Sequence, residues 1–158
     1  MKIYQTEDVA LIAKLNEHVH RLHEIWYPSL FKSYNFTEIK REFEKIIKRP
    51  QFCFFMIEDK QVPLGYAWIE KREYVTSAFR QFTKSLYIHQ LCVIPEARGQ
   101  GFGKALMFEI ERLAMREGYT QLELDYWVKN QAASDFYSSI GYRVQRQQVV
   151  KEMPTFAI

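Results

Sequence analysis

Several residue types are scarce in this chain of 158 residues. It holds two cysteines, Cys53 and Cys92, and two thiols at that spacing form no metal-binding motif. We expect both thiols to be buried and reduced, while a disulfide between them stays an open alternative. No apolar run approaches the ~18 residues of a membrane span. Glu7 and Asp8 interrupt the segment where a signal peptide needs its apolar core. These features predict a cytoplasmic protein that binds no membrane.

A large excess of one charge sign is also missing. The chain carries 22 Lys and Arg against 19 Asp and Glu, a net charge of +3. The basic residues are spread along the chain rather than gathered in a stripe, so nucleic-acid binding is not predicted. With 47% hydrophobic residues, the composition indicates a globular protein, and the length fits a single domain over residues 1–158.

The spacing of hydrophobic residues predicts an α/β fold of the α+β type. Apolar residues three or four apart predict helices, and runs rich in aromatic and β-branched residues predict strands. The expected helices cover residues 7–26, 38–49, 101–117 and 131–140, and the expected strands cover 3–4, 52–58, 62–71, 85–94, 121–128 and 142–153. The last two helices each end at a glycine, Gly118 and Gly141. We therefore expect a mixed, twisted sheet of about six or seven strands, flanked by helices.

Glycine is scarce except in one stretch, PEARGQGFGKAL at residues 95–106. Three of the six glycines lie here, at positions 99, 101 and 103. A Walker A loop is excluded, because Arg98 stands where that motif needs its first glycine and Ala105 where it needs Ser or Thr. A dinucleotide fingerprint is disfavoured, because Lys104 replaces its third glycine.

The remaining pattern is Arg-x-x-Gly-x-Gly between a strand and a helix. Amides at a helix start have no partners within the helix, and the helix dipole attracts anions there. Glycines let phosphate oxygens approach these amides, and Arg98 and Lys104 add positive charge. The stretch predicts a pyrophosphate-binding loop. The plain alternative is a glycine-rich turn before an ordinary helix.

At this point the sequence resembles the GNAT superfamily of N-acetyltransferases. LCVIPEARGQGFGKALM is similar to that family's strand, pyrophosphate loop and helix. ELDYWVKNQAASDFYSSIGYR is similar to its second half, so that the resemblance covers roughly residues 86–143. It implies a GNAT fold and acetyl-CoA as cofactor.

The resemblance also implies cofactor contacts by position. The strand residues matching those that pair with the pantetheine arm are Leu91, Cys92 and Val93. The loop residues matching the pyrophosphate site are Arg98, Gly99, Gln100, Gly101, Phe102, Gly103 and Lys104. Asn130 matches a residue that contacts the cofactor arm, and Tyr137 matches the general acid beside the thioester sulfur.

Three of these roles have plain structural alternatives. Tyr137 shares a helical stripe with Ala133, Phe136 and Ile140, which is typical of packing. Asn130 also fits the N-cap of the short helix. His89 is the candidate general base, since its ordinary pKa is near 6.5, but it also fits a structural histidine on a half-buried strand. Glu123 and Asp125 are further candidates for the base.

The first helix region supplies candidates for the acceptor site. Where the resemblance places one wall of that site, the chain carries His23, Trp26, Tyr27 and Phe31. We predict no metal site here, because His18, His20 and His23 do not form a metal-binding spacing.

The resulting hypothesis is an enzyme that transfers an acetyl group from acetyl-CoA to a primary amine, directly within a ternary complex. The acceptor is expected to be a small molecule or a peptide, and a homodimer stays open. The alternatives are a non-catalytic acyl-CoA-binding or sensing module on the same fold, and a dinucleotide-binding protein.

Overall fold

The hydrophobic runs after Pro50 and a short N-terminal strand form one mixed sheet in the computed structural model, which describes residues 1–155. Within that range the sheet has the order β1-β2-β3-β4-β5. Its strands are β1 (Lys2–Gln5), β2 (Phe52–Asp59), β3 (Val62–Tyr74), β4 (Thr83–Val93) and β5 (Gln121–Leu124). The first four strands pair antiparallel, whereas β4 and β5 are parallel.

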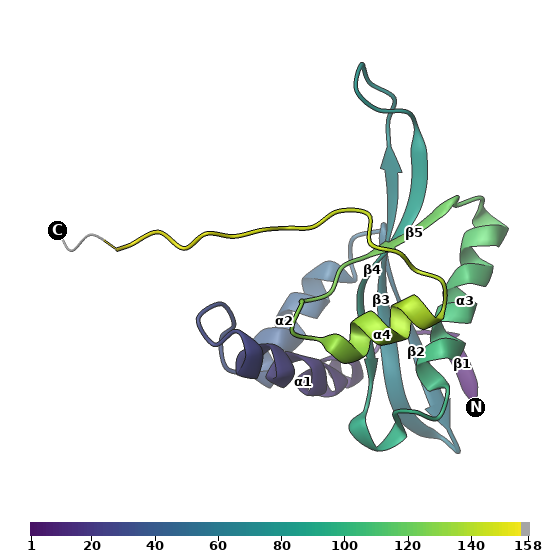
Figure 1. Ribbon diagram of the computed structural model, residues 1–158. Helices are drawn as coiled ribbons and strands as arrows, with labels where there is room; N and C mark the ends of the chain where they lie inside the picture. The colour runs from purple at the N-terminus through teal and green to yellow at the C-terminus, as the bar shows by residue number, and fades with distance from the viewer. Residues whose placement is uncertain (156–158) are drawn as a thin grey trace. The chain divides into compact units, whose positions relative to one another are not determined.

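Three α-helices accompany this sheet within residues 1–125. They are α1 (Val9–Trp26), α2 (Phe36–Ile46) and α3 (Phe102–Glu117), and a 3-10 turn, η1 (Pro95–Ala97), precedes α3. Figure 1 shows α1 and α2 on the opposite side of the sheet from α3. The core beneath α1 and α2 combines Ile12 and Phe43 with Phe54 and Tyr66 from the sheet. The helices α1 and α2 therefore cover one face of the sheet, including strands β2 and β3.

Helix ends follow local sequence signals, with small differences from the prediction. Asp8 caps α1 by accepting a hydrogen bond from the Leu11 amide, so that the helix begins at Val9 rather than at residue 7. Asn35 caps α2, which therefore begins at Phe36, two residues earlier than expected. Gly118 ends α3 with a φ of 74°, as its position predicts.

A second unit begins at Tyr126 and is described by itself. It contains α4 (Gln131–Ser139), followed by Gly141 with a φ of 94°. The glycine ends this helix as predicted, because only glycine adopts that backbone conformation without strain.

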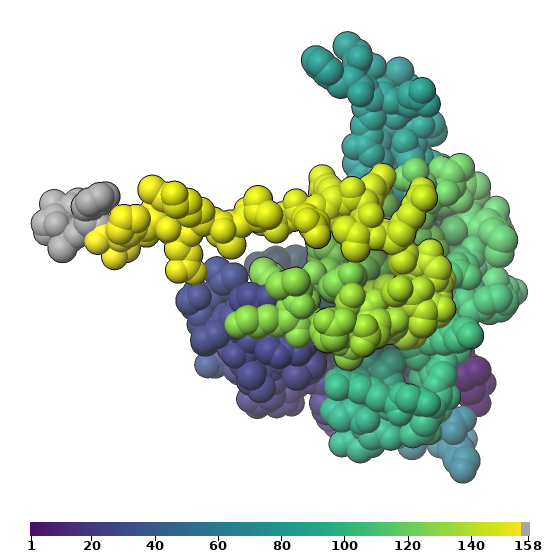
Figure 2. Space-filling view, viewed as in Figure 1, coloured from purple at the N-terminus to yellow at the C-terminus, as the bar shows by residue number. Residues whose placement is uncertain are grey.

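The predicted last strand over residues 142–153 is wrong. Residues 142–155 have no regular secondary structure and run as an extended chain, drawn in yellow in Figure 2. Val144, Val149 and Val150 are between 64% and 88% exposed. Alternating residues do not make a strand without a paired neighbour, and the described residues supply none. The sheet therefore has five strands within residues 1–155, where six or seven were predicted.

The hairpin between β3 and β4 is longer than expected. The predicted loop over residues 72–84 shrinks to 75–82, because β3 and β4 continue pairing to Tyr74 and Thr83. Figure 2 shows the tip, in teal, standing away from the rest of the first unit. Phe79 at this tip is 100% exposed.

Candidate functional site

The glycine stretch forms a turn that leads from β4 into α3. Gly99 has a φ of 73° and Gly101, the N-cap of α3, a φ of 89°. Both conformations are left-handed and disfavour a side chain. Gly103 lies within the first turn of α3 and has no such requirement. Two of the three glycines are thus needed by the backbone of the turn itself.

Space around this turn is open. A Cβ atom added at Gly99 or Gly101 would have no heavy atom within 4 Å. Helix α3 begins with Phe102, Gly103 and Lys104. The backbone amides of these residues have no hydrogen-bond acceptor within the helix, because they lie in its first turn. The turn therefore has the two properties of an anion-binding loop, which are unpaired amides at a helix start and room for a ligand beside them.

Arg98 and Gln100 brace the turn. Arg98 Nε donates to the carbonyl oxygen of Val93 at 3.0 Å, which ties the turn to the end of β4. Gln100 Nε2 donates to the carbonyl oxygen of Glu96 at 3.0 Å. The guanidinium of Arg98 therefore stays at the turn and contributes positive charge there.

The edge of β4 opens beside this turn. Its pairing with β5 runs from Ser85 opposite Gln121 to Ile88 opposite Leu124. Within the described residues, Leu91, Cys92 and Val93 then have no strand partner on that side, although β3 still pairs with them on the other. A free strand edge is able to pair with an extended, amide-bearing ligand.

A close approach of backbones fixes the position of this edge. A Cβ atom at Gly65 on β3 would lie 2.2 Å from the carbonyl oxygen of Cys92. Gly65 is therefore required by the approach of β3 to β4. Sequence reasoning missed this residue, because its partner is far away in the chain.

His89 is the extra residue of a bulge in β4. Trp68 pairs with Gln90 and Ile69 with Ile88, which leaves His89 without a partner in the register. Its ring stacks on Trp68 with centroids 4.4 Å apart and meets Tyr87 at 4.9 Å. Bulges redirect side chains, and they are common next to functional sites.

A carboxylate orients the His89 ring. Nε2 of His89 lies 2.7 Å from Oε2 of Glu70, which also accepts hydrogen bonds from Arg72 at 2.7 and 2.9 Å. Since a carboxylate only accepts, Nε2 carries the proton and Nδ1 of the neutral ring keeps a lone pair. The sequence analysis did not predict the contact of Glu70 with His89, which depends on the register between β3 and β4.

Both partners are held in the ionisation state that a base needs. Burial lowers the pKa of His89, against the raising effect of the Glu70 carboxylate. Burial works to raise the pKa of Glu70, but hydrogen bonds from Arg72 and His89 hold it below its ordinary value. Near neutral pH, His89 is therefore uncharged and Glu70 is ionised.

The two further candidates for the general base, Glu123 and Asp125, form hydrogen bonds with other residues. Glu123 accepts hydrogen bonds from Ser85 at 2.7 Å and Tyr74 at 3.2 Å. Asp125 accepts one from Tyr87 at 2.5 Å. Both carboxylates are thus engaged with hydroxyl donors, whereas His89 is held by a carboxylate at Nε2.

Cys53 and Cys92 are both buried and free, as expected. Cys92 donates a weak hydrogen bond from Sγ to the Leu15 carbonyl oxygen at 3.4 Å. Burial raises the pKa of Cys92 to about 12 and that of Cys53 to about 11. Such thiols are poor nucleophiles, because the thiolate is the reactive form.

In the second unit, Asn130 and Tyr137 have clear local contacts. Asn130 caps α4 by accepting a hydrogen bond from the Ala133 amide at 3.0 Å. Tyr137 is buried, stacks on Tyr126 at 6.1 Å and also meets the rings of Phe136 and Tyr142. Burial raises the pKa of Tyr137, which keeps its phenol protonated. The structural alternatives considered for both residues are thus present, and neither excludes a second role.

The candidate acceptor residues gather at the end of α1. The ring of His23 meets that of Phe31 at 4.9 Å and that of Trp26 at 6.2 Å. Burial, and secondarily the neighbouring His20, lower the pKa of His23. Within residues 1–155, no group of three His, Cys, Asp or Glu side chains is arranged to hold a metal ion. Over the same range, no helix combines the length and the apolar character needed to cross a bilayer.

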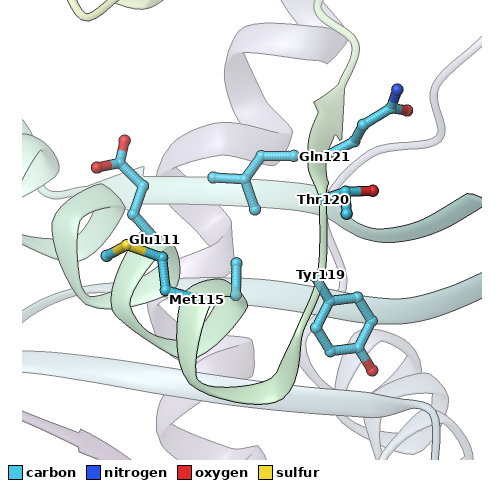
Figure 3. A pocket seen from close by; sticks show the side chains of 7 residues that line it. Glu111, Met115, Tyr119, Thr120 and Gln121 are labelled. Atoms are coloured by element: carbon cyan, nitrogen blue, oxygen red, sulfur yellow. The ribbon is translucent and has the colours of Figure 1, made fainter.

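The cavities of the first unit include one at each side of the sheet's core region, and neither contains a residue of the glycine turn. One of about 250 Å³ lies between the last turns of α3 and the start of β5; Figure 3 shows Glu111 and Met115 on the helix and Tyr119, Thr120 and Gln121 on the segment beside it. The glycine turn stands at the other end of α3, and 16 residues of helix separate the two ends by roughly 24 Å. This cavity is therefore not part of the loop site. The other cavity, of about 140 Å³, lies against α1, α2 and the sheet.

The antiparallel sheet, its one parallel pair and the glycine turn beside it place the chain among α+β proteins. The model of the acetyltransferase (GNAT) family matches residues 18–142, and the chain belongs to that family. The resemblance stated from the two sequence motifs is thereby confirmed.

Relatives agree with this assignment. An uncharacterized N-acetyltransferase of Methanocaldococcus jannaschii, MJ1207, is 32% identical over 117 residues, which is 69% of this chain and 46% of that protein. The chain thus matches about half the length of this relative.

Solved structures confirm the fold. A tetramutant of the BH1408 protein from Bacillus halodurans has a TM-score of 0.91 and 25% identity, covering 97% of this chain and 100% of the other. The aminoglycoside N-acetyltransferase AAC(6')-Iy, solved in complex with CoA, has a TM-score of 0.69 and 16% identity, covering 96% and 93%. The latter likeness concerns the fold alone.

Proposed function

We propose that residues 1–158 act as a single N-acetyltransferase domain, which transfers an acetyl group from acetyl-CoA to the primary amine of a small molecule or peptide. The observation that carries the proposal is the glycine turn, with Gly99 and Gly101 in left-handed conformations beside open space at the start of α3. The family match supports the same activity.

The residues fit acetyl-CoA at two points. Amides from Gly99 to Lys104, together with Arg98, would hold its pyrophosphate. The free edge at Leu91, Cys92 and Val93 would pair with its pantetheine arm, and Asn130 is proposed as a further contact. When bound, acetyl-CoA supplies an acetyl group activated as a thioester.

Two residues of the chain would carry out the proton transfers, His89 as the base and Tyr137 as the acid. Nδ1 of His89 accepts a proton from the amine, directly or through water, while Glu70 holds the ring by Nε2. A backbone amide near Cys92 would donate a hydrogen bond to the carbonyl oxygen of the thioester. Tyr137 holds a proton on its phenol oxygen for the leaving thiolate. Cys92 takes no covalent part, because its thiol is buried and has a raised pKa.

Calorimetric titration with coenzyme A tests the cofactor site. Gly101→Val introduces a branched side chain at a φ of 89° and is expected to abolish measurable binding. Gly118→Val is the matched control, because Gly118 has a similar φ of 74° but lies at the far end of α3. The proposal fails if the wild type does not bind coenzyme A, or if both variants bind it equally well.

Tyr137→Phe tests catalysis separately from binding. We expect kcat to fall by at least tenfold with an amine acceptor, on the scale of general-acid contributions, while the affinity for coenzyme A stays unchanged. Equal kcat would assign Tyr137 to packing alone. Coenzyme A binding without turnover on any amine would instead indicate a non-catalytic acyl-CoA-binding module.

A further inference from the structure

Arg72 on β3 binds the same carboxylate oxygen that orients the His89 ring. Its Nε and Nη2 both donate to Oε2 of Glu70, at 2.9 and 2.7 Å. Nε2 of His89 lies 2.7 Å from that oxygen as well. Each oxygen of a carboxylate has about two lone-pair sites, so three N–H groups share fewer sites than they can use. Arg72 and His89 therefore compete for one oxygen atom of Glu70.

An aromatic ring on the neighbouring strand holds the guanidinium of Arg72 in place. Its Cζ atom lies 3.7 Å from the centroid of the Tyr87 ring on β4. The Tyr87 hydroxyl donates to Asp125, directly after β5, at 2.5 Å, which fixes the ring in turn. The same ring meets that of His89 at 4.9 Å. Because arginine stays protonated in proteins, a permanent positive charge is thus held beside His89.

The surroundings of the imidazole are otherwise aromatic. Three rings pack against it with centroids 4.4 to 5.7 Å away, and they belong to Phe52, Trp68 and Tyr87. Arg49 in turn lies over the Phe52 ring, 4.8 Å from its centroid. Burial among these groups lowers the pKa of His89. The carboxylates of Glu70 and Asp125 act to raise this pKa, whereas the charge of Arg72 acts to lower it.

We propose that Arg72 is a positioning residue for the candidate base, which holds Glu70 by the oxygen that His89 uses and competes with a protonated His89 for it. While His89 is neutral, Glu70 accepts from both side chains. Once the ring carries a second proton, on Nδ1, its charge faces that of Arg72 across the shared oxygen. Like charges disfavour the protonated form, so the Nδ1 proton passes to water more readily.

Arg72 would thereby return the base to its neutral form after each transfer. The place of this step in catalysis rests on the proposed function, but the effect of Arg72 on the protonation of His89 does not.

An NMR titration of the His89 ring, without any acetyl-CoA, tests the proposal. Arg72→Gln should move the midpoint to higher pH, because the imidazolium loses a cationic neighbour and a competitor for Glu70. Arg72→Lys keeps the positive charge and should keep the midpoint closer to that of the wild type. The spectrum of His89→Gln identifies the signal among those of the four histidines.

Arg80→Gln is the matched control for this titration. Arg80 also stacks on a tyrosine, with its Cζ atom 3.6 Å from the centroid of Tyr74, so the variant loses the same charge and a similar contact. We expect it to leave the midpoint of His89 unchanged. Equal shifts in Arg72→Gln and Arg80→Gln would overturn the proposal, since net charge alone would then explain them.

Two further results would also overturn it. One is a midpoint that stays in place or moves to lower pH in Arg72→Gln, and the other is a midpoint as high in Arg72→Lys as in Arg72→Gln. Arg72→Met provides a second neutral side chain that still covers the Tyr87 ring. It should shift the midpoint in the same direction as Arg72→Gln, and it replaces that variant if the glutamine protein does not fold.

A pH profile of kcat/KM separates this inference from the proposed function. In Arg72→Gln the acidic limb should move to higher pH, and kcat/KM on the limb should fall about tenfold for each pH unit of movement, with little change on the plateau. Acetyl transfer by a protein whose NMR midpoint is unmoved in Arg72→Gln would overturn the role of Arg72 alone. A shifted midpoint in a protein that acetylates no amine would overturn the proposed function and leave the effect on His89.

Discussion

The carboxylate of Glu70 orients the His89 ring and raises its pKa. Replacing Glu70 should therefore change the pH dependence of kcat/KM. Neutral His89 is the active form of the proposed base, so kcat/KM should rise with pH through the pKa of His89. Because burial lowers that pKa, the acidic limb is expected below pH 6.5. Glu70 raises the pKa of His89, so Glu70→Gln should move the limb to still lower pH. The measurement is a pH profile of kcat/KM.

Glu73→Gln serves as the control for this profile. Glu73 lies on the same strand, three residues on, and is exposed. Its neutralisation changes the net charge by the same amount, and we expect it to leave the acidic limb in place. A limb that moves to higher pH in Glu70→Gln, or that moves equally in both variants, would contradict the His89–Glu70 arrangement.

The thiols of Cys53 and Cys92 should be inert in the native protein. With pKa values raised to about 11 and about 12, thiolate is a small fraction of either residue at pH 8, and both side chains are buried. We expect Ellman's reagent to titrate two thiols only after unfolding in guanidinium chloride. Rapid native-state modification that abolishes activity would instead support a covalent role for Cys92.

Among the helices and strands, the sequence predicted those features that depend on residues close together in the chain. The glycine turn, the C-terminal ends of α3 and α4, and the strands β2 and β3 follow from glycine positions and short-range spacing, and the structure contains them. Gly65, the bulge at His89 and the contact of Glu70 with His89 were not predicted. Each depends on the register between two strands, and the spacing of residues within one strand does not fix that register.

Gly65→Ala tests the closest approach in the sheet. Its methyl group would lie 2.2 Å from the Cys92 carbonyl oxygen, so one strand must move. We expect a loss of ~1–3 kcal/mol in the free energy of unfolding, the range of overpacking. Coenzyme A affinity should fall as well, because the displaced backbone is the proposed pairing edge. Chemical denaturation and calorimetry measure the two effects.

Gly118→Ala provides the comparison. Its φ of 74° makes alanine unfavourable by ~1–2 kcal/mol, but its Cβ would meet no atom within 4 Å. We expect a similar loss of stability with unchanged coenzyme A affinity. If both alanine variants lose affinity in proportion to stability, Gly65 has no specific role in placing β4.

At the scale of the whole molecule, we expect limited proteolysis to begin in the segment after α4. Arg143, Arg146 and Lys151 are exposed, in a segment without regular secondary structure, so trypsin should cleave there before it cleaves residues 1–125. Mass spectrometry of a limited digest identifies the first products. First cuts within the sheet would contradict this. Protection that increases with protein concentration would indicate that a second copy covers the segment, which is one way in which a homodimer could form.

The early end of β5 has a consequence for solubility. Among residues 1–155, the edge of β4 has no neighbouring strand after Ile88 on the β5 side. Such an edge is a template for any other chain with free amides, and it promotes aggregation. A ligand seated along Leu91–Val93 would occupy those groups. Saturation with coenzyme A should therefore slow the onset of turbidity on heating. The same ligand would then serve the protein twice, as a reactant during turnover and as a guard against self-association between turnovers.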